Sequence, residues 1–375
     1  MRGAASPAPH SSPATLQQSR DWFLPYNPAL DGLRAIAIAL VILSHAHVPH
    51  VDGAFFGVDL FFVLSGYLIS SLLLIEIRQT DRIDLWRFYR RRFFRLMPAL
   101  LAFLAAYCLI APLIWPDNGE WYQDAVVSAL YLADYGIAFF DSPDSLLHMW
   151  SLSVEEHYYL LWPIALLALT RLAPRGALWR SVGMLFLLAW GWRTFWVWQG
   201  QQFYEVFFRF DTRATGLLAG SLLAALRQDR PAWFQRLGAH VRWGPWLLAL
   251  APLWIGLKWD DMNVMVWAMP LVELTSLALL LAVLPAPGDA ATGAAAPRGW
   301  IYTLLSYPAL VKIGQLSYAI YLWHYPIVRV LRAYLDWPWV VLLGGLLSAL
   351  MAQLSWLTVE RWGRAWRDRK SRVAV

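Results

Sequence analysis

Apolar segments of about 20 residues, separated by short basic loops, recur along this chain from residue 30 to residue 358. A helix that crosses a bilayer needs about 20 largely apolar residues. A soluble domain of 375 residues that is 59% hydrophobic and 15% charged could not bury so much apolar surface, because its surface area grows too quickly relative to its core. The sequence therefore predicts an all-α integral membrane protein.

We expect about ten transmembrane helices. Their predicted ranges are 30–48, 57–75, 98–115, 152–170, 181–199, 212–226, 243–257, 264–284, 309–330 and 338–358. Residues 116–150 are too polar to span the bilayer, and 126–140 within them is predicted to be an interfacial amphipathic helix. Residues 285–299 are rich in Pro, Ala and Gly, which predicts a flexible loop.

Three parts are predicted along the chain. Residues 1–26 lack an apolar core and are expected to be a disordered tail, residues 27–360 form the transmembrane domain, and residues 361–375 form a basic tail. If the amino terminus lies inside and each span crosses once, most of the 31 Lys and Arg residues fall on the inner side. Such an excess marks the cytoplasmic side, so both termini are expected in the cytoplasm.

Composition excludes several kinds of site. The single cysteine, Cys108, excludes a disulfide framework and a cysteine-rich metal cluster, and it is interpreted as a buried structural thiol. A net charge of +6 would suit a nucleic-acid partner. However, the basic residues lie in short loops between apolar segments, the pattern that encodes membrane topology, so no nucleic-acid partner is expected.

The first span, LDGLRAIAIALVILSHA, carries Asp31, Arg34 and His45 among apolar residues. A charged group in a span costs a few kcal/mol, so each is a functional candidate. Eleven helical steps of about 100° return to nearly the same direction, which places Arg34 and His45 on one face with Asp31 close to it. At 1.5 Å per residue they are about 16 Å apart, so they share a groove without touching.

Two other interpretations of this span stay open. Asp31 and Arg34 could form an ion pair at the inner helix end, with His45 as a hydrogen-bonded interfacial histidine. His45, His47 and His50 could also bind a metal ion, but too few carboxylates lie nearby to complete a site. We predict no metal.

The second span, GVDLFFVLSGYLISSLL, carries Asp59, Ser65 and Gly66. Seven helical steps place Asp59 and Gly66 on one face. Helix packing through small residues explains Ser65 and Gly66. It does not explain Asp59, which stays a candidate for the chemistry.

Five arginines lie within nine residues of the loop that follows the second span. They are Arg87, Arg90, Arg91, Arg92 and Arg95. Membrane topology explains part of this excess. The planar guanidinium fork also suits phosphate, which predicts a nucleotide-like or phospholipid partner on the cytoplasmic side.

Later segments add four further polar candidates. In HMWSLSVEEHYYLLWP, His148 and Glu155 are seven residues apart and share a face if helical, although an aromatic belt with incidental charges is an alternative. RFDTRATGLLAG carries Arg213, and IGQLSYAIYLWHYPI carries His324. A lone intramembrane histidine often bonds a neighbouring carbonyl, so His324 alone decides little.

Six of these segments resemble, in the same order, the acyltransferase-3 family, whose members acylate cell-surface sugars in bacteria. They are LDGLRAIAIALVILSHA, GVDLFFVLSGYLI, FYRRRFFRLMP, HMWSLSVEEHYYLLWP, RFDTRATGLLAG and IGQLSYAIYLWHYPI, and the resemblance runs from residue 26 to residue 360. It implies a multi-pass protein of the bacterial cytoplasmic membrane. Each segment alone is weakly specific, whereas six in order are strongly so.

The resemblance also implies site residues. An Arg–ten residues–His element matches Arg34 and His45, an Arg-Arg-x-x-Arg element matches Arg91, Arg92 and Arg95, and the family's glutamate matches Glu155. The chain departs from the family at His157, where many relatives carry Gln, and near Glu360. Because the chain stops soon after its tenth span, we expect no extracytoplasmic esterase-like domain.

The expected reaction is O-acyl transfer from cytoplasmic acyl-CoA to a hydroxyl of a surface glycan or glycolipid. His45 would act as the general base, with Glu155, Asp59 or His148 to orient it. Arg91, Arg92 and Arg95 would bind the CoA phosphates, and Arg34 would steady the pantetheine or the thioester oxygen. Residues expected near the substrates are His148, Arg213, His324 and Ser65.

No tightly bound cofactor is expected, and the predicted partners are acyl-CoA, the glycan acceptor and the bilayer. The oligomeric state does not follow from the sequence. A transporter that uses His45 and Asp59 as a proton relay is the alternative. It would often show repeats and broken helices, which the sequence lacks, and a non-catalytic scaffold leaves the shared polar faces unexplained.

Overall fold

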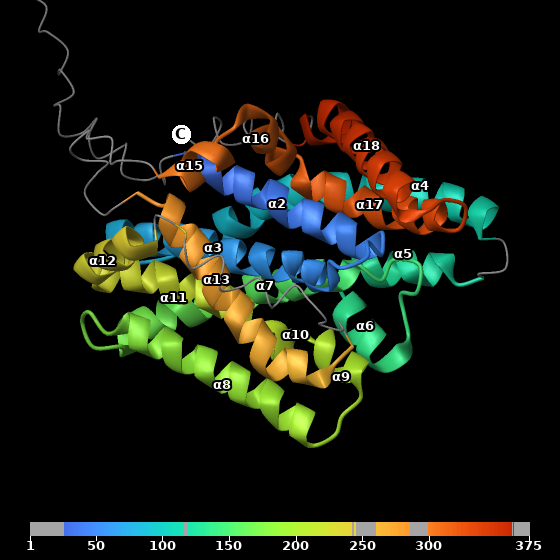
Figure 1. Ribbon diagram of the computed structural model, residues 1–375. Helices are drawn as coiled ribbons and strands as arrows, with labels where there is room; N and C mark the ends of the chain where they lie inside the picture. The colour runs from blue at the N-terminus through green and yellow to red at the C-terminus, as the bar shows by residue number, and fades with distance from the viewer. Residues whose placement is uncertain are drawn as a thin grey trace, which may run out of the picture.

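The computed structural model describes residues 26–115, 119–241, 244, 260–285, 299–361 and 363. Every regular element within them is a helix (Figure 1). The long helices are α2 (Pro28–His45), α3 (Gly57–Thr80), α4 (Leu85–Ile114), α7 (Met149–Leu172), α8 (Leu178–Trp198), α11 (Thr215–Asp229), α13 (Met269–Val283), α17 (Ser317–Arg332) and α18 (Trp337–Ser355).

Shorter helices connect or flank these. They are η1 (Asp52–Phe56), α5 (Trp121–Ala129), α6 (Ala133–Phe140), α9 (Phe203–Phe207), α10 (Phe210–Arg213), α12 (Pro231–Val241), η3 (Val264–Ala268), α15 (Trp300–Leu305), α16 (Pro308–Gln315) and η4 (Trp356–Glu360). The predicted interfacial helix over 126–140 is thus two helices, α5 and α6, interrupted at residues 130–132. Positive φ at Tyr131 marks this break.

Five helical segments of the described chain are long and apolar enough to cross a membrane. They are Pro28–His45, Asp52–Thr80, Leu85–Ile114, Val264–Val283 and Trp337–Glu360. The all-helical membrane fold is therefore confirmed, whereas ten spans and cytoplasmic termini stay predictions. Helices α7, α8, α11 and α17 lie on four further predicted spans, and most of the predicted span 243–257 lies outside the described residues.

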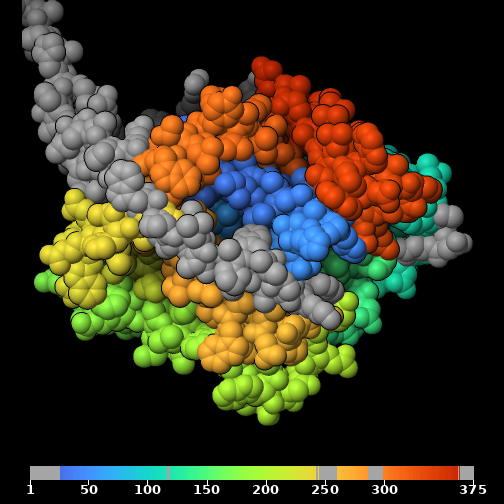
Figure 2. Space-filling model, in the orientation of Figure 1, coloured from blue at the N-terminus to red at the C-terminus, as the bar shows by residue number. Residues whose placement is uncertain are grey.

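Most of the predicted loop 285–299 and nearly all of both predicted tails also lie outside the described residues. Large apolar side chains cover the outside of the bundle, as expected for lipid contact. Leu109 is 75% exposed on α4, and Leu350 is 53% exposed on α18. In Figure 2 the surface of α2 (blue) is visible between the surfaces of α15 and α16 (orange) and that of α18 (red).

Local sequence sets the ends of α2. The Asn27 side chain accepts a hydrogen bond from the backbone N–H of Ala29 at 3.1 Å, and Pro28 occupies the first helical position. The helix ends at His45, and His47 follows with a left-handed φ of 52°. Asp31 and Arg34 therefore lie near one end of α2, and His45 lies at the other.

Glycines allow α3 and α11 to pack backbone to backbone. A Cβ atom on Gly66 would lie 1.9 Å from the carbonyl oxygen of Leu217, and one on Gly220 would lie 2.0 Å from that of Val63. Such contacts are typical of membrane helices packed through small residues. The small-residue interpretation of Gly66 is confirmed.

Candidate active site

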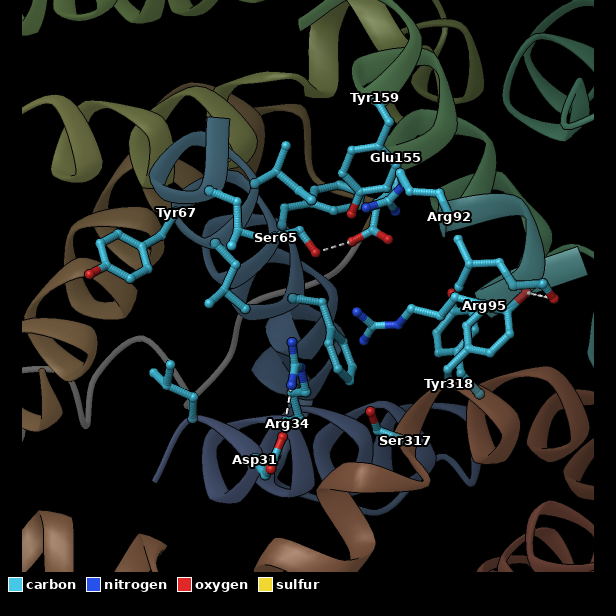
Figure 3. A pocket seen from close by; sticks show the side chains of 18 of the residues that line it. Asp31, Arg34, Ser65, Tyr67, Arg92, Arg95, Glu155, Tyr159, Ser317 and Tyr318 are labelled. Carbon is cyan, nitrogen blue, oxygen red and sulfur yellow. Dashed lines mark hydrogen bonds and ion pairs between the residues drawn. The ribbon is translucent and has the colours of Figure 1, made fainter. Parts of the chain in front are cut away.

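A cavity of about 380 Å³ lies among α2, α3, α4, α7 and α17, and we call it the arginine cavity. Figure 3 shows Arg34 and Arg95 extending into it from different helices, with Ser65 and Glu155 on its wall. Its charged lining residues are Asp31, Arg34, Arg92, Arg95, Glu155 and Arg227. With four guanidinium groups against two carboxylates, this cavity is suited to an anion.

The four arginines differ in how far they are already paired. Arg34 Nη1 lies 2.8 Å from a carboxylate oxygen of Asp31, so the ion pair considered from the sequence is present. Arg92 stacks 3.2 Å from the centre of the Tyr159 ring and lies 3.5 Å from a carboxylate oxygen of Glu156. Arg227 donates hydrogen bonds to the Tyr67 hydroxyl and to the backbone oxygen of Pro285. For Arg95, the structure records no ion pair with any described residue. Arg95 is therefore the arginine best placed to bind a ligand.

Two other predicted residues can be placed relative to this cavity. Ser65 Oγ donates a hydrogen bond of 2.7 Å to Glu155 Oε1, which joins α3 to α7 at the cavity wall. Arg91, the first arginine of the Arg-Arg-x-x-Arg element, is exposed and does not line the cavity. The structure thus brings Arg34, Arg92, Arg95, Glu155 and Ser65 together and leaves Arg91 outside.

Three histidines from distant parts of the chain meet at the far end of α2. We call His45, His148 and His324 the histidine cluster. His324 Nε2 lies 3.1 Å from His45 Nδ1, and the ring centres of His148 and His324 are 5.4 Å apart. His148 also stacks on Tyr325, with ring centres 4.9 Å apart. No group of three or more His, Cys, Asp or Glu in the described part of the chain is arranged to hold a metal ion.

Hydrogen-bond partners assign the protons on two of these rings. His324 Nδ1 lies 2.6 Å from the carbonyl oxygen of Tyr321, which can only accept, so Nδ1 carries the proton. In a neutral ring, His324 Nε2 is then an acceptor, and His45 Nδ1–H donates to it. His45 Nε2 is left with a free lone pair. This is the arrangement that a general base requires.

A second cavity, of about 340 Å³, is lined by His45. Its lining residues are His45, Tyr325, Val328, Arg329, Arg332 and Ala333. We call it the second cavity. All but His45 come from one face of α17 and its end, at helical spacings of three and four residues.

Tyr321 connects the arginine cavity to the histidine cluster. It lines the arginine cavity, and its ring centre lies 5.1 Å from that of His324 and 5.6 Å from that of His148. Its hydroxyl donates to the backbone oxygen of His148 at 2.8 Å and contacts Ser151 Oγ. The histidine cluster therefore lies between the two cavities.

A buried aspartate outside the predicted spans, Asp124, holds the segment that leads to His148. The carboxylate of Asp124 on α5 accepts hydrogen bonds from the backbone N–H groups of Asp144, at 3.2 Å, and Ser145, at 2.9 Å. Burial raises the pKa of Asp124, and the two backbone donors oppose that shift. These hydrogen bonds hold residues 144 and 145, which lie just before His148 and the start of α7 at Met149.

Asp59 and Arg213 lie in neither cavity, because they bind each other. Arg213 Nη2 and an Asp59 oxygen are 3.1 Å apart in a fully buried ion pair. Arg193 and Glu273 form a second buried pair, 4.0 Å apart. The Thr215 hydroxyl bridges its two members, because it accepts from Arg193 and donates to Glu273. The expected contact of Asp59 with His45 is absent from the described interactions, and His324 occupies that place instead.

Sequence reasoning did not identify Tyr321, Tyr325, Arg329 or Arg332. A signal was available for the last three, since their spacing places them on one face of a helix that also carries His324. What the sequence does not show is that this face meets the end of α2. His45 and His324 are separated by 279 residues.

Comparison with known proteins identifies the family of this chain. A family model described as an acyltransferase domain matches residues 27–359. The O-acetyltransferase OatA of Staphylococcus aureus is 31% identical, over 89% of this chain and 57% of that protein. The peptidoglycan O-acetyltransferase OatA of Listeria monocytogenes is 31% identical, over 89% of this chain and 55% of that protein.

The chain spans about half the length of these curated relatives. No solved structure matches it. The family match covers nearly the whole of the predicted transmembrane domain, and the resemblance identified from the six segments is confirmed. This multi-pass membrane protein therefore belongs to the acyltransferase-3 family.

Proposed function

We propose that this protein moves an acyl group, in the first place acetyl, from cytoplasmic acyl-CoA to a hydroxyl of a cell-surface glycan. The observation that carries the proposal is the histidine cluster between two cavities, one of them rich in arginine. Such a site can hold a phosphate-bearing donor on one side and an acceptor on the other. The relatives named O-acetyltransferase and peptidoglycan O-acetyltransferase support acetyl and a cell-wall glycan as substrates.

The donor is assigned to the arginine cavity because CoA carries several phosphates. Guanidinium groups bind phosphate through paired, charge-assisted hydrogen bonds. Arg95 and Arg92 come from the basic segment that the topology prediction assigns to the cytoplasm, where acyl-CoA is available. The proposal therefore includes ten spans, cytoplasmic termini and a place in the bacterial cytoplasmic membrane.

His45 carries the central chemical step. Its free Nε2 takes the proton of the acceptor hydroxyl as the hydroxyl oxygen attacks the thioester carbonyl, so a C–O bond forms and the C–S bond breaks. The proton then passes from His45 to the departing CoA thiolate, which leaves His45 neutral for the next turnover. A positioned base of this kind contributes about 10²- to 10⁴-fold to the rate.

The base is tested with the purified chain, acetyl-CoA and cell-wall glycan fragments in detergent. We expect His45→Ala to lower acyl transfer by about 10²-fold or more. His240→Ala, at an exposed histidine on α12, is the matched control and should transfer at the wild-type rate. Transfer that survives His45→Ala would exclude the base, and glycan uptake without CoA release would indicate a transporter.

The donor site is tested by comparing acetyl-CoA with an acetyl thioester of N-acetylcysteamine, which lacks the phosphates. We expect Arg95→Gln to raise KM for acetyl-CoA by about 10-fold or more, because charge-assisted hydrogen bonds are lost, with little change for the truncated thioester. Arg87→Gln removes an exposed arginine outside the cavity and should change neither value. An equal effect of Arg95→Gln on both donors would rule out phosphate binding at this position.

A further inference from the structure

The second cavity has an arginine that the transfer step itself leaves unused. We propose that this cavity selects acceptors with an anionic group, a carboxylate or a phosphate, close to the hydroxyl that is acylated, and that Arg332 binds that group. The inference rests on the acyl-transfer function proposed above. It extends that function by naming the chemical class of the acceptor and the residue that recognises it.

The lining of the second cavity is cationic and apolar. Arg329 and Arg332 provide its formal charges, and none of the residues described as lining it is Asp or Glu. Its volume of about 340 Å³ falls in the range of small-molecule sites. Val328 and the ring of Tyr325 form an apolar wall beside the charges. A neutral acceptor would add no negative charge to this lining.

The two arginines are not equivalent. Arg329 is already neutralised, because its Nη2 lies 2.9 Å from the Asp144 carboxylate and its Nη1 donates to the Asp144 backbone oxygen at 3.0 Å. For Arg332 the structure records no ion pair with a described residue. Arg332 is therefore the cation in this cavity that still lacks an anion.

Arg332 is also next to the base. Its Nη1 donates a 3.2 Å hydrogen bond to the backbone oxygen of His45. A guanidinium group has five N–H donors, so the others remain available to a ligand. An anion bound there lies beside His45, whose imidazole lines the same cavity. This places the anionic group and the reacting hydroxyl on one small molecule, such as a uronic acid or a sugar phosphate.

The experiment compares matched acceptors with the purified full chain in detergent and saturating acetyl-CoA. Methyl β-D-glucuronide supplies a carboxylate, glucose 1-phosphate supplies a phosphate, and methyl β-D-glucoside is the neutral reference. We expect kcat/KM for at least one anionic sugar to exceed that of the neutral sugar by about 10-fold or more, the usual strength of a charge-assisted hydrogen bond. The preferred anion then distinguishes carboxylate from phosphate recognition.

Variants at Arg332 separate recognition from structure. We expect Arg332→Gln to bring the ratio of anionic to neutral kcat/KM close to one, and Arg332→Lys to preserve much of it. A purely structural role would lower both rates together and leave the ratio unchanged. Arg209→Gln, which removes an arginine paired with Asp211 away from both cavities, is the control and should keep the wild-type ratio.

Anion binding is also measured without turnover, as the rise in unfolding temperature caused by each sugar in the absence of acetyl-CoA. If an anionic sugar raises the unfolding temperature of the wild type but not that of Arg332→Gln, the inference is supported whatever the transfer rate. Wild-type transfer with equal use of charged and neutral acceptors, or a ratio unaffected by Arg332→Gln, would overturn the anionic acceptor alone. Absence of CoA release with every acceptor would instead contradict the proposed function.

Discussion

The hydrogen bond between His324 and His45 gives the sharpest prediction about the mechanism. His324 Nε2 accepts from His45 Nδ1–H and thereby leaves the lone pair of His45 Nε2 free for the acceptor. His324→Phe retains a ring of similar size but removes the acceptor atom. The His45 ring then keeps its hydrogen bond to the Val41 backbone but loses the one to His324 that selects the Nδ1–H tautomer. The imidazole can then adopt the tautomer that cannot act as a base at Nε2.

The expected loss of transfer rate in His324→Phe follows from the hydrogen bond that His45 loses. A buried donor without an acceptor costs about 1–3 kcal/mol, which corresponds to a loss of about 5- to 150-fold at 1.4 kcal/mol per tenfold. His45→Ala removes the base itself and should cost more, about 10²- to 10⁴-fold. His324→Gln supplies a side-chain oxygen that can accept the same hydrogen bond, so we expect its loss to be smaller than that of His324→Phe.

The assay is steady-state acetyl transfer with both substrates varied, for the three variants and for the double variant His45→Ala/His324→Phe. If His324 acts through His45, the loss falls on kcat, KM for acetyl-CoA stays near its wild-type value, and the double variant is no slower than His45→Ala alone. Additive losses in the double variant, or a Phe variant as fast as the Gln variant, would refute this reasoning.

Two further predictions concern packing and topology. Gly66→Ala places a methyl group against a backbone carbonyl of α11 and should lower the unfolding temperature in detergent and the yield of folded protein, whereas Gly345→Ala, at a helical glycine with open space, should be neutral or slightly stabilising. In a Cys108→Ala background, a membrane-impermeant maleimide added to intact cells should label Tyr334→Cys but not His240→Cys; the reverse pattern would invert the predicted orientation.

How much of the site the sequence predicts depends on whether a relation is local. Helical periodicity predicts that Arg34 and His45 share a face and a groove, about 16 Å apart. The structure differs in the groove, because Arg34 lines the arginine cavity and His45 lines the second cavity. Hydropathy predicts where most helices lie, because lipid contact constrains every long segment. The approach of α17 to the end of α2 depends on packing between helices far apart in the chain. For that reason His324 is identifiable as polar but not as the partner of His45.

The same distinction explains Asp59. A charged side chain in an apolar span implies that it has a partner, but it does not identify that partner. For Asp59 the partner is Arg213, 154 residues away, and a second pair from Arg193 and Glu273 completes a buried group without net charge. Removing one member would leave an uncompensated buried charge, at a cost of about 3–5 kcal/mol. Their pairing accounts for these four residues without any role in chemistry.

The charged residues of this bundle therefore fall into two groups, those with an oppositely charged partner and those without one. A guanidinium group that already has an acidic partner gains less from a second anion than one that has none. For Arg95 in the arginine cavity and Arg332 in the second cavity, the structure records no ion pair with a described residue. An acyl-CoA phosphate would balance the first, and an anionic acceptor would balance the second. On this reasoning each substrate completes the electrostatics of its own cavity, and the pair of His45 and His324 lies where the two cavities approach each other.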